Sequence, residues 1–165
     1  MKDHWKDRVR PNLDHILSLF DRPELGAFIT GHLILESILV QLIELKLIDK
    51  DRINLFDMSF PSKVNMAKSR GVIDNEMSEF LIAVNTIRNH LTHRLGEEIN
   101  FETMYSLVQI AHRGGVDFSD DTIHSDKSSS EEWYGVGGII QEIFQNAALD
   151  LAFIMVQHGG EFQFD

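Results

Sequence analysis

Cysteine is absent from this chain of 165 residues. Its absence excludes disulfides, thiolate zinc sites, iron–sulfur clusters and cysteine nucleophiles, and nothing in the composition indicates an oxidising compartment. Residues 1–7 are too polar to form a secretory signal. The most apolar stretch, residues 33–48, is interrupted by Glu36, Glu44 and Lys46, so it predicts a buried helix rather than a membrane span. We therefore expect a cytoplasmic protein that does not bind membranes.

Positive charge is also scarce, because 15 lysines and arginines face 26 aspartates and glutamates and leave a net charge of −11. Nucleic-acid-binding proteins usually have a basic face, since phosphate contacts supply most of their affinity. The deficit is uneven: residues 61–95 contain five basic and three acidic side chains, whereas residues 113–142 contain two and seven. Two interpretations follow, a local positive patch near Arg88 or an acidity that serves only solubility.

No convincing strand pattern occurs, and no internal repeat or composition break divides the chain. With 43% hydrophobic and 25% charged residues, the composition is that of a globular protein. We predict one all-α domain over residues 1–165, a bundle of five to six helices. The expected helices cover about residues 12–20, 24–48, a short stretch from Pro61 to before Gly71, 75–95 with Asp74 as cap, 101–112 and 131–158.

Two further segments invite a functional interpretation. Residues 117–130 are polar, acidic and rich in serine, and predict a mobile loop. Gly135, Gly137 and Gly138 suggest a phosphate-binding loop, but no strand precedes them and no Lys-Ser/Thr pair follows. Close helix packing or a kink is the better interpretation of these glycines.

The helix expected after Asp74 changes character toward its end. On a helical wheel its apolar residues form one arc, whose members are Phe80, Val84, Ile87, Leu91 and Leu95. A second arc is largely apolar in the earlier turns and wholly polar in the later ones, where it consists of Asn85, Arg88, Asn89, Thr92 and His93. A plain solvent-facing helix would more often show lysine and glutamate there, so this arc is a candidate polar site.

The residue types in this arc suit phosphate chemistry. An arginine fork binds a phosphate with two hydrogen bonds and stabilises the charge of a pentavalent phosphorus. Histidine accepts or donates a proton near neutral pH, and Asn89 lies one helical turn before His93, where its amide can orient the imidazole. Arg88 and His93 are about 140° apart on the wheel, but the arginine side chain is long enough to reach a shared cleft. One arginine and one histidine make a sparse site for cleaving RNA. This interpretation implies a homodimer that supplies two sets.

The stretch of residues 85–93, Asn-Thr-Ile-Arg-Asn-His-Leu-Thr-His, resembles the signature of the HEPN superfamily: arginine, a polar residue, three further residues, then histidine. The similarity covers about residues 24–95. Within the superfamily the chain most resembles the mannitol-operon-repressor branch, with which it shares Phe60, Lys63, Ala67, Gly71 and Ile73. The resemblance implies a helical bundle, often dimeric. Several members of the superfamily are metal-independent endoribonucleases of toxin, abortive-infection and CRISPR systems. The last 70 or so residues resemble no known family.

Carried over to this chain, the resemblance implies that Arg88 and His93 are the catalytic pair and that Asn89 supports them. Asn85, Thr92 and His90 are further supporting candidates. One toxin subgroup has a tyrosine two residues after the histidine, where this chain has Leu95, which argues against membership of that subgroup. The repressor-like branch keeps the Arg-Asn…His pattern without an established nuclease role.

Plainer interpretations stay open for the same residues. Arg88, Asn89 and His93 can simply join the helix to its neighbours through backbone hydrogen bonds. His90 and His93 have the i, i+3 spacing of zinc ligands, but the sequence places no third ligand, so we expect no metal and no other cofactor. His32 and Glu36, four residues apart, predict a hydrogen-bonded pair inside the bundle, with a supporting role at the site as the alternative.

Two functions therefore compete. The motif favours an endoribonuclease of toxin or phage-defence type, a homodimer that cleaves RNA by attack of the 2′-hydroxyl on the adjacent phosphate. The net charge favours a non-catalytic regulator, or an immunity or antitoxin-type protein, whose acidic surface binds a basic protein partner.

Overall fold

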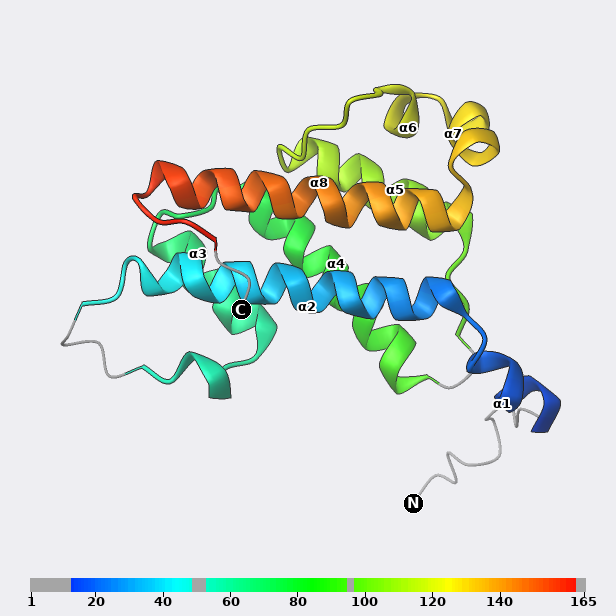
Figure 1. Ribbon diagram of the computed structural model, residues 1–165, viewed down its shortest axis with the longest axis horizontal. Helices are drawn as coiled ribbons and strands as arrows, with labels where there is room; N and C mark the ends of the chain where they lie inside the picture. Colours follow the sequence, from blue (N-terminus) through cyan, green and yellow to red (C-terminus); the bar gives the residue numbers. More distant parts are fainter. Residues whose placement is uncertain (1–12, 49–52, 95–96, 163–165) are drawn as a thin grey trace, which may run out of the picture.

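The structure is a computed structural model that describes residues 13–48, 53–94 and 97–162. Every regular element in these ranges is helical, which confirms the predicted all-α class (Figure 1). The elements are α1 Leu13–Leu19, α2 Pro23–Glu44, the 3-10 turn η1 Leu55–Asp57, α3 Phe60–Ser69, α4 Asn75–His93, α5 Phe101–Arg113, α6 Thr122–Ser125, α7 Lys127–Trp133 and α8 Gly135–Gln157.

Capping side chains fix where the central helices begin. The Asp74 carboxylate accepts a hydrogen bond of 2.8 Å from the Met77 N–H, which confirms the predicted start of α4. Ser59 caps α3 and Asn100 caps α5 in the same way. The predicted end of α4 near Leu95 lies outside the described residues, and the described helix ends at His93.

The prediction of a mobile loop over residues 117–130 is wrong, because α6 and most of α7 lie within it. The Asp126 side chain caps α7, and the buried Ser130 hydroxyl donates a hydrogen bond of 2.7 Å to the Ile123 carbonyl oxygen. The Tyr134 hydroxyl donates to Asp120 at 2.6 Å, and this bond raises the pKa of Tyr134 to about 12. These contacts fold the segment on itself, and the Tyr105 hydroxyl of α5, which donates to the His124 carbonyl oxygen at 3.1 Å, joins it to the bundle.

The last helix also begins later than expected. Residue 131 belongs to α7, and Gly135 takes a positive φ of 59°, which only glycine adopts without strain. The chain changes direction at this glycine, which is the first residue of α8, as the kink interpretation predicted (Figure 1).

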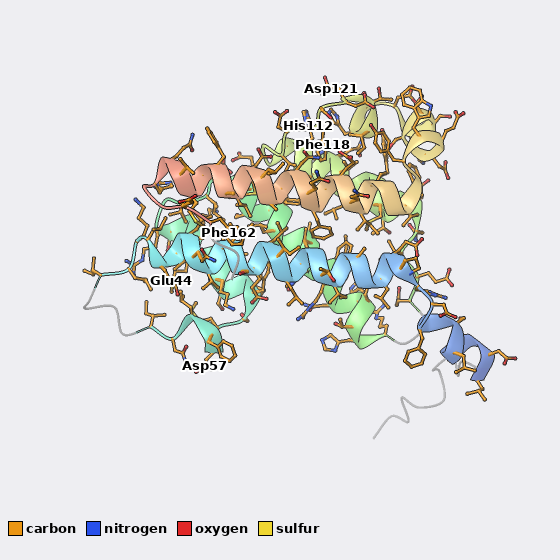
Figure 2. The ribbon with its side chains drawn as sticks, in the orientation of Figure 1. Glu44, Asp57, His112, Phe118, Asp121 and Phe162 are labelled. Carbon is orange, nitrogen blue, oxygen red and sulfur yellow. The ribbon has the colours of Figure 1, made fainter. Side chains whose placement is uncertain are left out.

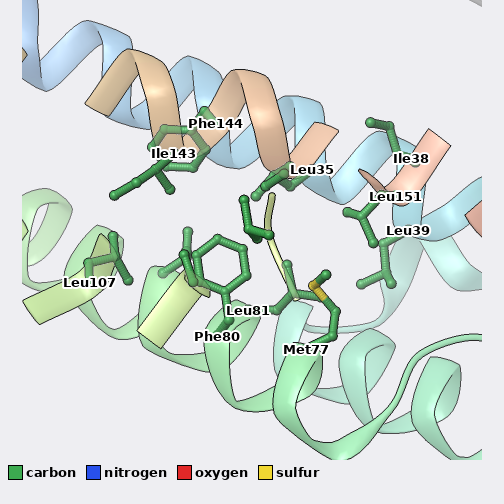
Figure 3. Close-up of a cluster of buried hydrophobic side chains, with 14 of the residues drawn as sticks. Leu35, Ile38, Leu39, Met77, Phe80, Leu81, Leu107, Ile143, Phe144 and Leu151 are labelled. Atoms are coloured by element: carbon green, nitrogen blue, oxygen red, sulfur yellow. The ribbon is translucent and has the colours of Figure 1, made fainter. Parts of the chain in front are cut away.

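The two longest helices, α2 and α8, lie side by side and run in the same direction, while α4 crosses behind them (Figure 1). Core side chains from all three helices meet between them; Figure 3 shows among others Leu35, Ile38 and Leu39 of α2, Met77, Phe80 and Leu81 of α4, and Ile143, Phe144 and Leu151 of α8. By length and composition α2 and α8 each meet the criteria for a membrane span. Each also buries one long face in the bundle, as core helices do.

Candidate functional site

The second half of α4 contains all six predicted site residues, at graded depth. Asn85 is buried against the bundle, whereas Arg88 and Asn89 are half-buried. The remaining three, His90, Thr92 and His93, are exposed to solvent. The polar arc therefore rises from the interior to the surface toward the end of the helix.

Arg88 is held in place by its neighbour along the chain. The Arg88 Nη1 donates a hydrogen bond of 2.9 Å to the Asn89 Oδ1. The sequence suggested instead that Asn89 orients the imidazole of His93, but its oxygen is bonded to the guanidinium. One bond uses one of the five N–H donors of an arginine, so Arg88 is positioned without being saturated.

Thr92 turns back onto its own helix. Its hydroxyl donates to the Arg88 carbonyl oxygen at 3.0 Å, with a longer contact of 3.4 Å to the Asn89 carbonyl oxygen. Thr92 therefore supports the helix backbone, because its hydroxyl proton is already donated to a carbonyl oxygen of the preceding turn.

His93 is the last residue of α4 and is exposed. It follows Arg88 by five residues, which corresponds to about 7.5 Å along the axis and about 140° around it. The two side chains of one copy therefore leave the helix on different sides.

Behind the polar arc lies a buried imidazole. His32 of α2 is 1% exposed and its ring packs against Phe60 at 4.5 Å between centroids. Burial lowers the pKa of His32, and the positive charges of Arg88 and Lys63 lower it further. The ring is therefore neutral at neutral pH.

The polar neighbours of His32 do not bond it as the sequence suggested. Neither ring nitrogen has a hydrogen-bond partner among the described residues, although the Asn85 side chain lies near enough to favour the charged ring. Glu36, the expected partner, accepts instead from the Lys63 Nζ at 2.7 Å. The predicted His32–Glu36 hydrogen bond is therefore wrong.

The Lys63–Glu36 ion pair is a further contact at this site that the sequence did not indicate. The Lys63 side chain is only 7% exposed and that of Glu36 is 23% exposed. Their residues are 27 positions apart on α3 and α2, so no local spacing points to the pair. The pair joins α3 to α2 directly beside His32.

The expected positive patch near Arg88 is smaller than the count of basic residues suggests. Lys63 is compensated by Glu36, and Arg94 forms an exposed ion pair of 3.3 Å with Glu97. Lys68 is bonded to Asn75, toward the other end of α4. Around the polar arc, Arg88 is thus the main source of positive charge.

No group of three or more histidine, aspartate or glutamate side chains with metal-binding geometry occurs in the described part of the chain. The His90 and His93 pair therefore gains no third ligand there.

No family model, no curated protein and no solved structure matches this chain. Any functional conclusion must therefore come from the arrangement of the side chains themselves.

Proposed function

We propose that this protein is a metal-independent endoribonuclease of the HEPN type that acts on RNA as a homodimer. The observation that favours it is the pairing on one helix of a positioned arginine with an exposed histidine. Asn89 holds the Arg88 guanidinium by accepting a hydrogen bond from one of its nitrogens. His93, five residues later, is exposed to solvent. Metal-free cleavage of RNA needs one group that stabilises the charge on the phosphoryl oxygens and one that transfers protons. A positioned arginine and an exposed histidine can serve as these two groups.

The proposed reaction proceeds by transfer within the RNA strand. A neutral His93 of one copy takes the proton of the 2′-hydroxyl, and the 2′-oxygen forms a bond to the adjacent phosphorus. The bond from phosphorus to the 5′-oxygen breaks, and a protonated His93 of the other copy donates a proton to that oxygen. The products are a 2′,3′-cyclic phosphate and a 5′-hydroxyl.

Arg88 stabilises the charge that grows on the phosphoryl oxygens during this step. Its surroundings suit that task. His32 behind it is neutral, so no second positive charge repels the Arg88 guanidinium from the interior side. Because Lys63 is already paired with Glu36, the phosphate is drawn to Arg88 rather than to the interior.

The test is incubation of the purified protein with RNA in the presence of a metal chelator. We expect cleavage products ending in 2′,3′-cyclic phosphate, with the rate lowered at least about 100-fold in Arg88→Ala and in His93→Ala. Thr86→Ala, at an exposed position earlier on α4, is the matched control and keeps the wild-type rate. RNA that stays intact with and without divalent metal would rule out the enzyme.

A second function is favoured by a different surface. Acidic side chains around α6 and α7 are exposed, namely Asp117, Asp121, Asp126, Glu131 and Glu132. Such a surface suits a basic protein partner, as in a regulator or an immunity-type protein. Intact RNA combined with salt-sensitive binding of a lysine-rich peptide would support this alternative.

A further inference from the structure

Helix α1 and the turn after it expose an apolar stripe that the described part of the chain leaves largely uncovered. Leu13 and Leu17 of α1 are one helical turn apart, and Phe20 follows in the turn that ends the helix, seven residues after Leu13. Their exposed fractions are 69%, 54% and 81%. In Figure 1 this helix lies beyond the end of the bundle, below the start of α2. An apolar stripe of this kind is typical of a helix that packs against a partner.

The same chain offers an apolar groove between α2 and α8. The groove has a volume of about 880 Å³ and is lined mainly by apolar side chains, among them Ala27, Ile34, Ile38, Ile140, Phe144 and Ala148. Phe162, from the segment after α8, lies along the later turns of α2 and also lines the groove (Figure 2). Among the described residues, only α2 and α8 line the part of the groove nearer the start of α2.

The connection between α1 and α2 directs α1 away from its own groove. The Phe20 and Asp21 N–H groups continue the turn of α1 with hydrogen bonds of 3.2 Å. Arg22 is extended because Pro23 follows it, and its guanidinium binds Glu98 at 2.8 Å. A short, fixed connection of this kind disfavours the folding of α1 back onto the groove of its own chain. It favours the exchange of α1 between two copies.

We propose that two copies of this chain form a dimer by exchanging α1, so that each α1 lies in the α2–α8 groove of the other copy. The exposed stripe of one α1 offers roughly 300 Å² of apolar surface. Each groove exposes less surface than one arm, so the two contacts together bury roughly 1,000 Å², which is about the least expected of a specific interface. The exchange alone therefore supports a weak, concentration-dependent dimer.

The exchange also bears on the catalytic proposal, although it stands on separate observations. Arg22, Leu25 and Leu91 line one pocket of about 310 Å³, so the connection between α1 and α2 lies at the same end of the bundle as the last turns of α4. In a reciprocal exchange both connections cross near the two-fold axis. The ends of both α4 helices then lie at this end of the dimer, where the proposed reaction needs two copies.

Light scattering after gel filtration tests the association. The wild type is expected to be a dimer, and Phe20→Glu raises its dissociation constant at least about 100-fold, because both symmetric contacts are lost. Phe56→Glu is the matched control, since Phe56 is 90% exposed on η1 and takes no part in the exchange. A monomeric wild type, or a Phe20→Glu variant that dimerises as the wild type does, would overturn the proposal.

Cross-linking tests which groove α1 occupies, and the absence of cysteine makes every introduced thiol unique. A chain with Leu17→Cys is mixed with a differently tagged chain carrying Gln141→Cys or Gln145→Cys, two exposed groove positions on α8. A short bis-maleimide is expected to join the two chains. Three outcomes would each refute the exchange. A single chain that carries both cysteines is joined only within one monomer, or no product forms at either groove position. In the third, the protein is a monomer that sediments with phospholipid vesicles. These readouts do not depend on RNA cleavage. A dimer that is not joined at either groove position refutes the exchange alone, whereas a monomeric wild type also removes the homodimer on which the proposed function rests.

Discussion

Gly31 of α2 lies so close to Phe144 of α8 that a β-carbon at position 31 would sit 2.2 Å from the Cγ of the ring. The phenylalanine is itself fixed, because its ring makes an edge contact with Phe28 at 5.0 Å between centroids. The absence of a side chain at position 31 thus sets how closely the two longest helices approach.

Gly31→Ala is therefore expected to lower the free energy of unfolding by about 1–3 kcal/mol, since neither helix can move apart without opening the core. Gly26→Ala, on the same helix, is the matched control, because its β-carbon would meet nothing within 4 Å. That substitution is expected to raise stability by about 0.5–1 kcal/mol through helix propensity. Urea unfolding followed by circular dichroism measures both, and equal effects would contradict the close contact.

Lys63→Met is expected to destabilise the protein by about 1–3 kcal/mol, because it leaves the Glu36 carboxylate partly buried without its partner. Adding Glu36→Leu to that variant should recover part of the loss, since the uncompensated charge is then gone. Chemical unfolding of the two single variants and the double variant gives the coupling energy. Strictly additive effects would show that the pair does not interact.

Stability is expected to fall as the pH drops below about 6.5, the ordinary pKa of histidine, because of His32. Its pKa is lowered in the folded protein, so in this window the unfolded chain binds the additional proton and acid favours unfolding. His32→Gln should reduce the loss of stability between pH 7.5 and pH 5.5. His90→Gln, at an exposed position on α4, should not. An unchanged pH dependence in His32→Gln would refute this assignment.

Substitutions of Asn89 should separate positioning from charge. Asn89→Ala removes the acceptor that holds Arg88, and we expect kcat for RNA cleavage to fall about 10-fold with little change in KM. Asn89→Asp keeps an acceptor but compensates the guanidinium charge, so KM should rise instead. Steady-state kinetics on a short RNA distinguish the two. Identical kinetics for both variants would indicate that Asn89 only stabilises the helix.

Some of this structure follows directly from local sequence. Asp74 predicts the start of α4 because a carboxylate at that position satisfies the free N–H groups of the first turn, and the structure has this cap. The composition and spacing of apolar residues likewise predict the all-helical class. Such features depend on neighbours within a few residues.

Other features depend on contacts between distant segments and were missed for that reason. The short helices α6 and α7 are held by bonds such as Tyr134 to Asp120, which no periodicity reveals. The spacing rule paired Asn89 with His93, but the long Arg88 side chain reaches its direct neighbour instead. Lys63 finds Glu36 only once α3 packs against α2. At the site, the sequence indicated the residues of the arc but not their partners.

Gly31 and His32 are consecutive on α2, yet one meets the Phe144 ring of α8 while the other lies near Arg88 of α4. This single helix therefore forms a shared wall between the apolar groove and the polar arc. Any displacement of α2 caused by an occupant of the groove moves the imidazole behind the arginine by a similar amount. A ligand or substitution that shifted α2 at Gly31 would therefore also change the distance between the His32 ring and the Arg88 charge.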